Sequence, residues 1–185
     1  KKLQDQLYRI AIKQVENSDI LVFSDYNYGC LPQPLVDKLI NFSKKKDIIM
    51  GADSQSSSQM GDISRFKKMN FIFPTEHEAR ISLRNNDDGL VVLSEKLSEI
   101  AEAQNVVLKL GSEGILLHLK DSDKELNQTD RLRALNDSPK DVAGAGDSMM
   151  ITSLLGFASG ANGWESACLG SISAGIQVGR IGNTP

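Results

Sequence analysis

The sequence has few cysteines and no cysteine pattern of a known site. Its 185 residues include two cysteines, Cys30 and Cys168, which form no C-x-x-C pair and no Cys/His spacing typical of zinc ligands. Neither a disulfide framework nor a structural zinc site is therefore expected. A cytoplasmic protein is the simpler prediction, because disulfide-stabilised folds belong to oxidising compartments.

The sequence also lacks an excess of positive charge and any long apolar run. The formal net charge is -3, whereas binding to a phosphate backbone requires a concentrated positive surface. No nucleic acid is therefore expected as a partner, although a small anionic metabolite needs only a local positive pocket. The most apolar stretch, residues 149–158, is well short of the roughly 20 residues that cross a bilayer, so no membrane partner is expected either.

What is present is a composition ordinary for a folded protein. Hydrophobic residues make up 40% and charged residues 24% of the chain, enough for one sizeable core. We expect a single α/β domain over residues 1–185. Because the chain starts with Lys1 and residues 181–185 look like a loop that follows a helix, we expect a fragment of a longer protein.

Short apolar runs alternate with segments of helical periodicity along the chain. The predicted strands are residues 19–23, 48–52, 71–73 and 106–110, with 115–119 as the neighbour or hairpin partner of the last. The predicted helices are residues 3–15, 34–46, 75–80, 90–103, a long apolar helix opening at 144–147, and 164–178. This alternation predicts a mainly parallel sheet covered by helices on both faces.

Two glycines stand where the long apolar helix begins. Gly144 and Gly146 lack Cβ atoms, so their backbone can approach a ligand closely, and a helix N-terminus offers unpaired amides to an anion. Asp147 would lie beside that anion, where its carboxylate can take a proton from an attacking hydroxyl. Phosphoryl transfer requires this pairing. Alternatively, Gly144 and Gly146 make a tight turn, and Asp147 only caps the helix.

The segment D-V-A-G-A-G-D at residues 141–147 resembles the D-T-x-G-A-G-D signature of the ribokinase, or PfkB, carbohydrate kinase family. The resemblance implies that Asp147 is the catalytic base. It assigns the anion hole for the γ-phosphate of ATP to the backbone of Gly144, Ala145 and Gly146. Asp141 belongs to the same nucleotide-binding segment, and Val142 replaces the family threonine without removing a backbone donor.

Two further segments resemble motifs of the same family in the same order along the chain. S-D-Y-N-Y-G at residues 24–29 is similar to the S-D-Y-x-x-G of the heptose-phosphate kinase branch. V-L-K-L-G-S-E-G at residues 107–114 is similar to the nucleotide-binding strand and loop. The residues that this second similarity assigns to ATP binding are Lys109, Gly111, Ser112 and Gly114. Lys109 also fits a surface side chain, and a turn without a ligand also explains the glycines.

A fourth segment departs from its family motif. F-P-T-E-H-E-A at residues 73–79 looks like T-P-N-x-x-E-A, with Thr75 in place of the asparagine and Glu78 in place of the glutamate that helps to organise Mg²⁺ through water. Altered metal handling is therefore expected. Without the resemblance, Glu78 would be interpreted as a solvated helix residue, and Asp25 as a turn residue at a strand end.

The resemblance implies a three-layer ribokinase-like fold, with ATP, Mg²⁺ and a monovalent cation such as K⁺ as cofactors. The expected acceptor is a sugar or sugar phosphate, including heptose 7-phosphate. The chain corresponds to the later part of the family domain, so the first strands, the small β-lid and the Gly-Gly motif that holds the sugar would precede it. An exposed sheet edge would favour association, for example as a homodimer.

Three alternatives stay open at this point. The acceptor could be a nucleoside or a hydroxymethylpyrimidine rather than a sugar, because relatives that act on them share the final motif. The chain could instead be a non-catalytic nucleotide-binding module, which Thr75 favours. A dinucleotide-binding oxidoreductase has little support, since no G-x-G-x-x-G follows the first predicted strand.

Overall fold

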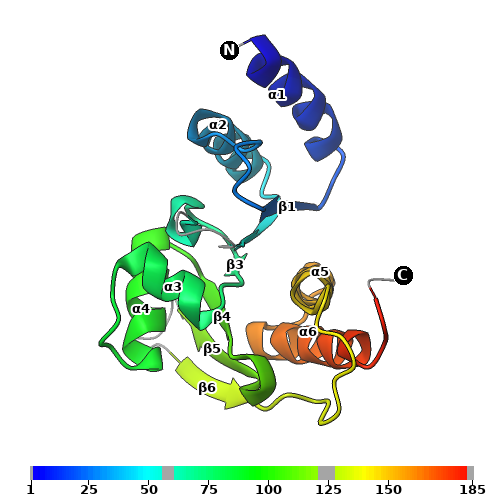
Figure 1. The fold of residues 1–185 in the computed structure, drawn as a ribbon. Coiled ribbons are helices and arrows are strands. Elements are labelled where there is room, and N and C mark those ends of the chain that lie inside the picture. Colours follow the sequence, from blue (N-terminus) through cyan, green and yellow to red (C-terminus); the bar gives the residue numbers. More distant parts are fainter. Residues whose placement is uncertain (1, 56–60, 121–127, 183–185) are drawn as a thin grey trace.

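The computed structural model describes residues 2–55, 61–120 and 128–182. These residues form one six-stranded sheet in which the spatial order of the strands equals their order in the chain (Figure 1). Strands β1 to β4 are parallel, whereas β5 and β6 each run antiparallel to the strand before them. The strands are β1 (Ile20–Asp25), β2 (Ile49–Ser54), β3 (Phe71–Ile72), β4 (Asn105–Lys109), β5 (Ile115–Leu119) and β6 (Gln128–Leu132).

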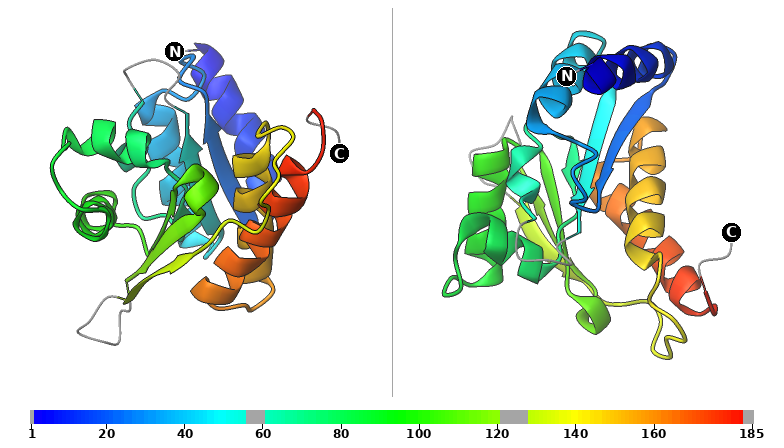
Figure 2. Two further views of the ribbon diagram at one scale, coloured as in Figure 1. Left: turned by 60° about the horizontal axis from the view of Figure 1, so that its bottom comes forward. Right: turned by 45° about the horizontal axis from the view of Figure 1, so that its top comes forward.

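Helices cover both faces of this sheet, as predicted for βαβ crossovers (Figures 1 and 2). One layer holds α1 (Lys2–Val15), α2 (Gln33–Lys45), the short 3₁₀ helix η1 (Ile63–Arg65), α3 (Glu76–Leu83) and α4 (Leu90–Ala101). The opposite layer holds α5 (Ala145–Ala158) and α6 (Gly163–Val178), which pack against each other. None of the helices within the described ranges is long and apolar enough to cross a bilayer.

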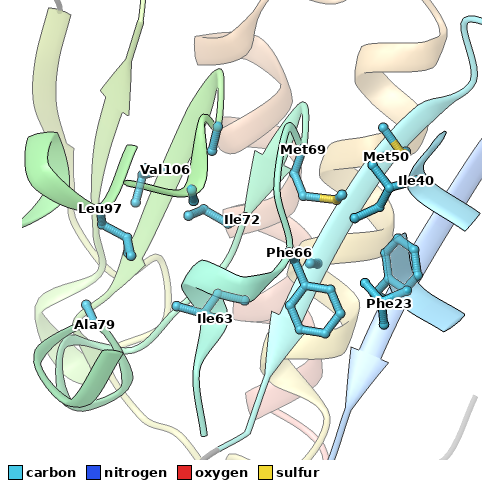
Figure 3. Close-up of a cluster of buried hydrophobic side chains, with 14 of the residues drawn as sticks. Phe23, Ile40, Met50, Ile63, Phe66, Met69, Ile72, Ala79, Leu97 and Val106 are labelled. Carbon is cyan, nitrogen blue, oxygen red and sulfur yellow. The ribbon is translucent and has the colours of Figure 1, made fainter. Parts of the chain in front are cut away.

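Side chains at alternate positions of the strands pack into two separate hydrophobic cores. In β4, Val106 and Leu108 point into the core beneath α2, α3 and α4, whereas Val107 points into the core beneath α5 and α6. This alternation follows from the two-residue period of a strand. Figure 3 shows the larger core, in which Phe23 of β1 and Phe66 lie with their ring centroids 5.3 Å apart. The sheet is therefore the middle layer of three.

Helix α5 lies unusually close to β2 because β2 carries a glycine at the contact. A Cβ atom on Gly51 would lie 2.4 Å from Cδ1 of Leu154, a separation that real side chains do not reach. Asp147 precedes Leu154 by about two helical turns. The packing of Leu154 on Gly51 thus sets the position of α5 along β2, which brings the first turn of α5 to the carboxyl end of β2.

The elements predicted from the sequence are present, with shifted ends. Strand β2 continues beyond the predicted range 48–52 to Ser54, β4 ends at Lys109, and α3 continues to Leu83. Strand β5 is the antiparallel partner of β4. Of the predicted loop at residues 54–59, positions 56–59 lie outside the described residues.

Strand β6 was not predicted. Its sequence is Gln-Thr-Asp-Arg-Leu, and three of its five residues are exposed, so it has neither an apolar run nor an apolar alternation. Its place in the sheet comes from backbone pairing with β5, where His118 lies opposite Thr129. The imidazole Nδ1 of His118 and the hydroxyl of Thr129 are 2.7 Å apart.

Candidate active site

The carboxyl ends of β2 and β4 meet the first turn of α5 at a buried ion pair. Nζ of Lys109, the last residue of β4, lies 2.7 Å from Oδ2 of Asp53 in β2. A Cβ atom on Gly146 would lie 3.3 Å from this ammonium group and 3.8 Å from the same carboxylate oxygen. The backbone at the start of α5 therefore stands directly over the pair. Open parallel sheets bind their ligands at this edge.

Asp53 has one carboxylate oxygen without a partner. The residue is 4% exposed, and Oδ1 accepts no hydrogen bond from the described residues. Burial raises the pKa of Asp53 above its ordinary value of 3.8; Lys109 opposes this, and the charges of Glu78 and Asp147 add to it. A buried polar atom that lacks a partner requires an explanation, and one explanation is a water or an ion.

Sequence reasoning missed Asp53, because the predicted strand stopped one residue before it. The available signal was an acidic residue directly after an apolar run, at the carboxyl end of a parallel strand. Lys109 was predicted to contribute to ATP binding. Its alternative interpretation as a surface side chain is wrong, because its side chain is only 15% exposed.

The first turn of α5 has backbone donors available for an anion. Gly144 is the N-cap and has a φ of 74°, in the left-handed region that strains other residues. The Ala145 amide donates to the Val142 carbonyl at 3.3 Å. Among the described residues, nothing accepts a hydrogen bond from the amides of Gly146 and Asp147. Two amide donors thus point away from the protein's own acceptors.

Asp147 is not the cap of its helix. The N-cap position belongs to Gly144, and no side chain in the described part of the protein caps α5. The Asp147 carboxylate is half-buried, accepts no hydrogen bond from the described part of the chain, and lies near enough to Asp53 to raise the pKa of that residue. Capping therefore does not account for this aspartate, and its carboxylate is available to a ligand.

Thr75 and Glu78 form the capping box of α3. The Thr75 hydroxyl accepts from the Glu78 amide at 3.2 Å, and Oε2 of Glu78 accepts from the Thr75 amide at 2.7 Å. Glu78 is 7% exposed, so its interpretation as a solvated helix residue is wrong. Thr75 also forms a β-bridge to Lys109, which brings the start of α3 beside the ion pair. A threonine preserves this cap where the family has asparagine.

The turn between β4 and β5 carries three of the predicted ATP-binding residues. Gly111 and Ser112 are exposed, Gly111 has a φ of 61°, and a Cβ atom on Gly111 would meet no atom of the described residues within 4 Å. A Cβ atom on Gly114 would lie 2.1 Å from the carbonyl oxygen of Leu132, so close packing against β6 already requires a glycine there. Contact of this turn with ATP stays a prediction.

Asp141 joins the loop before α5 to the segment after α6. Its two carboxylate oxygens accept from the amides of Ala143 and Gly182, each at 3.0 Å. The Ala143 bond, followed by the Gly182 bond, lowers the pKa of Asp141 below its ordinary value. This carboxylate positions the loop that leads into the anion site. Its predicted contact with nucleotide stays a prediction.

Asp25 ends β1 next to the same sheet edge, and it holds a second buried ion pair. Its two carboxylate oxygens accept from the Asn27 amide at 3.0 Å and from Nη2 of Arg65 at 2.6 Å. The guanidinium group of Arg65 also donates to Gln33 at 3.1 Å and stacks on the Phe66 ring. The interpretation of Asp25 as a turn residue is therefore correct but incomplete, since Arg65 was not predicted.

A family model described as pfkB family carbohydrate kinase matches residues 1–185. The chain belongs to the pfkB family. The resemblance found in the four sequence segments is thereby confirmed, and so is the ribokinase-like α/β fold that it implied.

Curated relatives of this pfkB chain include bifunctional HldE proteins. Over 180 residues, the chain is 28% identical to the HldE protein of Desulfatibacillum aliphaticivorans, and the aligned region covers 95% of this chain and 35% of the relative. Over 181 residues, it is 29% identical to the HldE protein of Hahella chejuensis, and the aligned region covers 97% of this chain and 36% of the relative. The chain thus spans about a third of the length of the curated relatives that it matches.

Solved structures of similar fold include two kinases. Phosphofructokinase-2 from Escherichia coli in complex with potassium superposes with a TM-score of 0.77 and 20% identity, over 95% of this chain and 56% of that one. Ribokinase from Arabidopsis thaliana, complexed with ribose and ATP, superposes with a TM-score of 0.74 and 16% identity, over 94% and 54%. At these identities the likeness establishes the fold alone.

The residues around the ion pair of this pfkB chain fit a partly hydrated Mg²⁺. No group of three acidic, histidine or cysteine side chains within the described ranges is close enough to enclose a metal ion. Mg²⁺ commonly keeps several waters and uses one or two carboxylates together with substrate phosphates. Oδ1 of Asp53, which has no hydrogen-bond partner among the described residues, matches that mode of binding together with Glu78 nearby.

Proposed function

We propose that the protein containing this chain transfers the γ-phosphoryl group of ATP to a hydroxyl of a sugar or sugar phosphate. The observation that carries the proposal is the Asp147 carboxylate in the first turn of α5, which accepts no hydrogen bond from the described residues. In the same turn, the amides of Gly146 and Asp147 have no described acceptor, and the backbone of Gly146 lies close to the Lys109 ammonium group. This arrangement combines a proton acceptor with donors for phosphoryl charge. The family membership of the chain supports the same reaction.

Each group has a separate role in the proposed step. Asp147 takes the proton of the acceptor hydroxyl while the new O–P bond forms and the bond between the γ-phosphorus and the β-phosphate oxygen breaks, releasing ADP. The amides of Gly146 and Asp147, together with Lys109, hold the charge on the transferred phosphoryl group. Asp53 and Glu78 would hold Mg²⁺, which neutralises charge on the phosphates.

Heptose 7-phosphate is the acceptor that we propose first. This proposal is supported by the S-D-Y-N-Y-G segment at residues 24–29 and by the HldE relatives, whose alignments cover 95% and 97% of this chain. A nucleoside or hydroxymethylpyrimidine acceptor remains the alternative within the same reaction class. The anion site alone does not distinguish them, because it recognises the phosphoryl donor.

A non-catalytic nucleotide-binding module is the second candidate function. Two observations favour it: Thr75 replaces the family asparagine, and the Ala145 amide, one of the predicted donors of the anion hole, already donates to Val142. Against it stands the preserved capping box, which keeps Glu78 in position despite the change at residue 75.

The test is phosphoryl transfer by the full-length protein that contains these residues. It is incubated with Mg²⁺ and γ-labelled ATP in the presence of heptose 7-phosphate, fructose 6-phosphate, ribose, adenosine or hydroxymethylpyrimidine. We expect label on the sugar phosphates, with heptose 7-phosphate labelled fastest. Calorimetric binding of ATP without transfer to any of these acceptors would contradict the kinase proposal and support the binding module.

A further inference from the structure

The loop that leads into α5 is held by a buried glutamine. Gln177, in the last turn of α6, is 7% exposed. Its Nε2 atom donates to the carbonyl oxygen of Ala143 at 3.2 Å and to that of Gly182 at 3.4 Å. One side-chain amide thus connects three segments: the loop before the anion site, the end of α6, and the residues that follow it.

The same place contains the oxygens that a monovalent cation would need. Such ions are bound by backbone carbonyls and other oxygens that replace part of their hydration shell. The Ala143 and Gly182 carbonyls converge on Gln177, and the Asp141 carboxylate bonds to the amides of these two residues. Carbonyl oxygens and a carboxylate therefore gather directly before the first turn of α5.

Each of these four oxygens already accepts one hydrogen bond. A side-chain amide nitrogen has two donors, and the two carbonyls account for both of them in Gln177. Each Asp141 oxygen accepts one backbone amide. A K⁺ ion at the point where the two carbonyls converge would have to displace the NH₂ group of a buried side chain, which would then lack acceptors. The residues that the structure describes here therefore do not fit the monovalent cation that the resemblance implied.

We infer that the Gln177 side chain holds the loop before α5, residues 141–143, in the position that a bound monovalent cation would otherwise secure. This protein therefore does not depend on K⁺. The amide is neutral and covalently attached, and it ties Ala143 and Gly182 together at any salt composition. The claim that Gln177 holds this loop does not depend on any catalytic activity. Only its consequence for turnover rests on the proposed kinase function.

The first test measures thermal stability of the full-length protein in KCl, NaCl and tetramethylammonium chloride at equal ionic strength. We expect the wild-type melting temperature to be the same in the three salts. Gln177→Leu keeps the bulk but loses both donors, and should melt at least about 2 °C lower in every salt. A wild-type protein that K⁺ stabilises and tetramethylammonium does not would overturn the inference, as would Gln177→Leu with wild-type stability.

Gln177→Glu tests whether the oxygens face a common space. A carboxylate cannot donate to the two carbonyls and instead adds oxygens, so we expect this variant to melt low in tetramethylammonium and to recover in KCl or NaCl. Gln6→Glu, which makes the same charge change at an exposed position of α1, controls for general salt effects and should respond equally to all three salts. The same response in Gln177→Glu as in Gln6→Glu would also refute the inference.

Turnover provides a separate measurement. With ATP and the preferred acceptor, wild-type rates should agree in KCl and tetramethylammonium chloride, while Gln177→Glu should be faster in KCl. A wild-type rate that falls severalfold without K⁺ contradicts the inference but leaves the kinase proposal intact. A protein without turnover in any salt fails the kinase proposal, and the melting measurements still decide the role of Gln177.

Discussion

Two buried aspartate–cation pairs lie side by side at the carboxyl edge of the sheet, and they differ in how completely they are bonded. Asp25 of β1 is 5% exposed and Asp53 of β2 is 4% exposed, and their contacts to Arg65 and Lys109 are 2.6 Å and 2.7 Å. Both oxygens of Asp25 accept hydrogen bonds, whereas Oδ1 of Asp53 accepts none from the described residues.

The difference separates a structural pair from a pair that is open to a ligand. The Asp25 pair joins the end of β1 to the 3₁₀ helix η1, and both oxygens of Asp25 accept hydrogen bonds within the protein. The Asp53 pair lies beneath the start of α5, where two amides have no acceptor among the described residues, and burial raises the pKa of the Asp53 carboxylate. Incomplete bonding of a buried charge costs stability, so the Asp53 pair is the one that we associate with function.

The largest stability effect is expected from Asp25→Asn. The substitution leaves the Arg65 guanidinium, whose side chain is 19% exposed, without its charged partner. Removing one member of a buried pair costs about 3 kcal/mol of unfolding free energy, measured by urea denaturation. Asp5→Asn breaks an exposed pair with Lys38 and should cost less than about 1 kcal/mol. Equal losses in the two variants would show that the Asp25 pair is not structural.

Asp53→Asn should reverse this pattern by affecting ligand binding more than folding. Loss of a carboxylate that supports a bound metal typically reduces affinity or activity about 10- to 100-fold. We expect the affinity for Mg·ATP to fall within this range in calorimetric titrations, with a smaller loss of stability than in Asp25→Asn. Unchanged Mg·ATP affinity, or a larger loss of stability than in Asp25→Asn, would contradict the distinction between the two pairs.

The pH dependence of stability sharpens the comparison further. Because the folded state raises the pKa of Asp53, the unfolded chain loses this proton first as the pH rises above 3.8. The stability of wild type relative to Asp53→Asn should therefore be greatest below that pH and decline as the pH rises through the folded pKa. Urea denaturation of both proteins at a series of pH values measures this. A difference that grows with pH would show that Lys109 outweighs burial.

The smallest effect is expected from Thr75→Asn, which restores the family residue. Asparagine caps helices about as well as threonine, so the unfolding free energy should change by less than about 0.5 kcal/mol. If Thr75 impairs Mg²⁺ handling, the Mg²⁺ concentration at half-maximal turnover should fall severalfold in this variant. Unchanged Mg²⁺ dependence would show that position 75 serves only the helix cap.

Local patterns in the sequence predicted the sheet, the helices on both faces and the start of α5. Apolar runs mark β1 and β2, and the two glycines before Asp147 mark a helix start that can approach an anion. These features depend on near neighbours in the chain. Strand β6 could not be found in this way, since pairing with β5 rather than its own apolar pattern places it in the sheet.

The contacts that define the candidate site join distant parts of the chain, so the sequence did not reveal them. Asp53 and Lys109 are 56 positions apart, and Asp25 and Arg65 are 40 apart. Gln177, in the last turn of α6, meets Ala143, which lies before the start of α5 and 34 positions away in the sequence. The burial of Glu78 likewise depends on α3 packing beside the ion pair. Only the three-dimensional arrangement distinguishes these residues from ordinary surface charges and turns.

The most direct test of the central claim is the rate of a single phosphoryl transfer in Asp147→Asn. We predict a decrease of about 100-fold or more, as for removal of a general base, with ATP affinity within threefold of wild type because the backbone amides remain. Asp137→Asn, an exposed change in the loop before α5, should transfer at the wild-type rate. An Asp147→Asn protein that transfers phosphate as fast as Asp137→Asn would contradict the account.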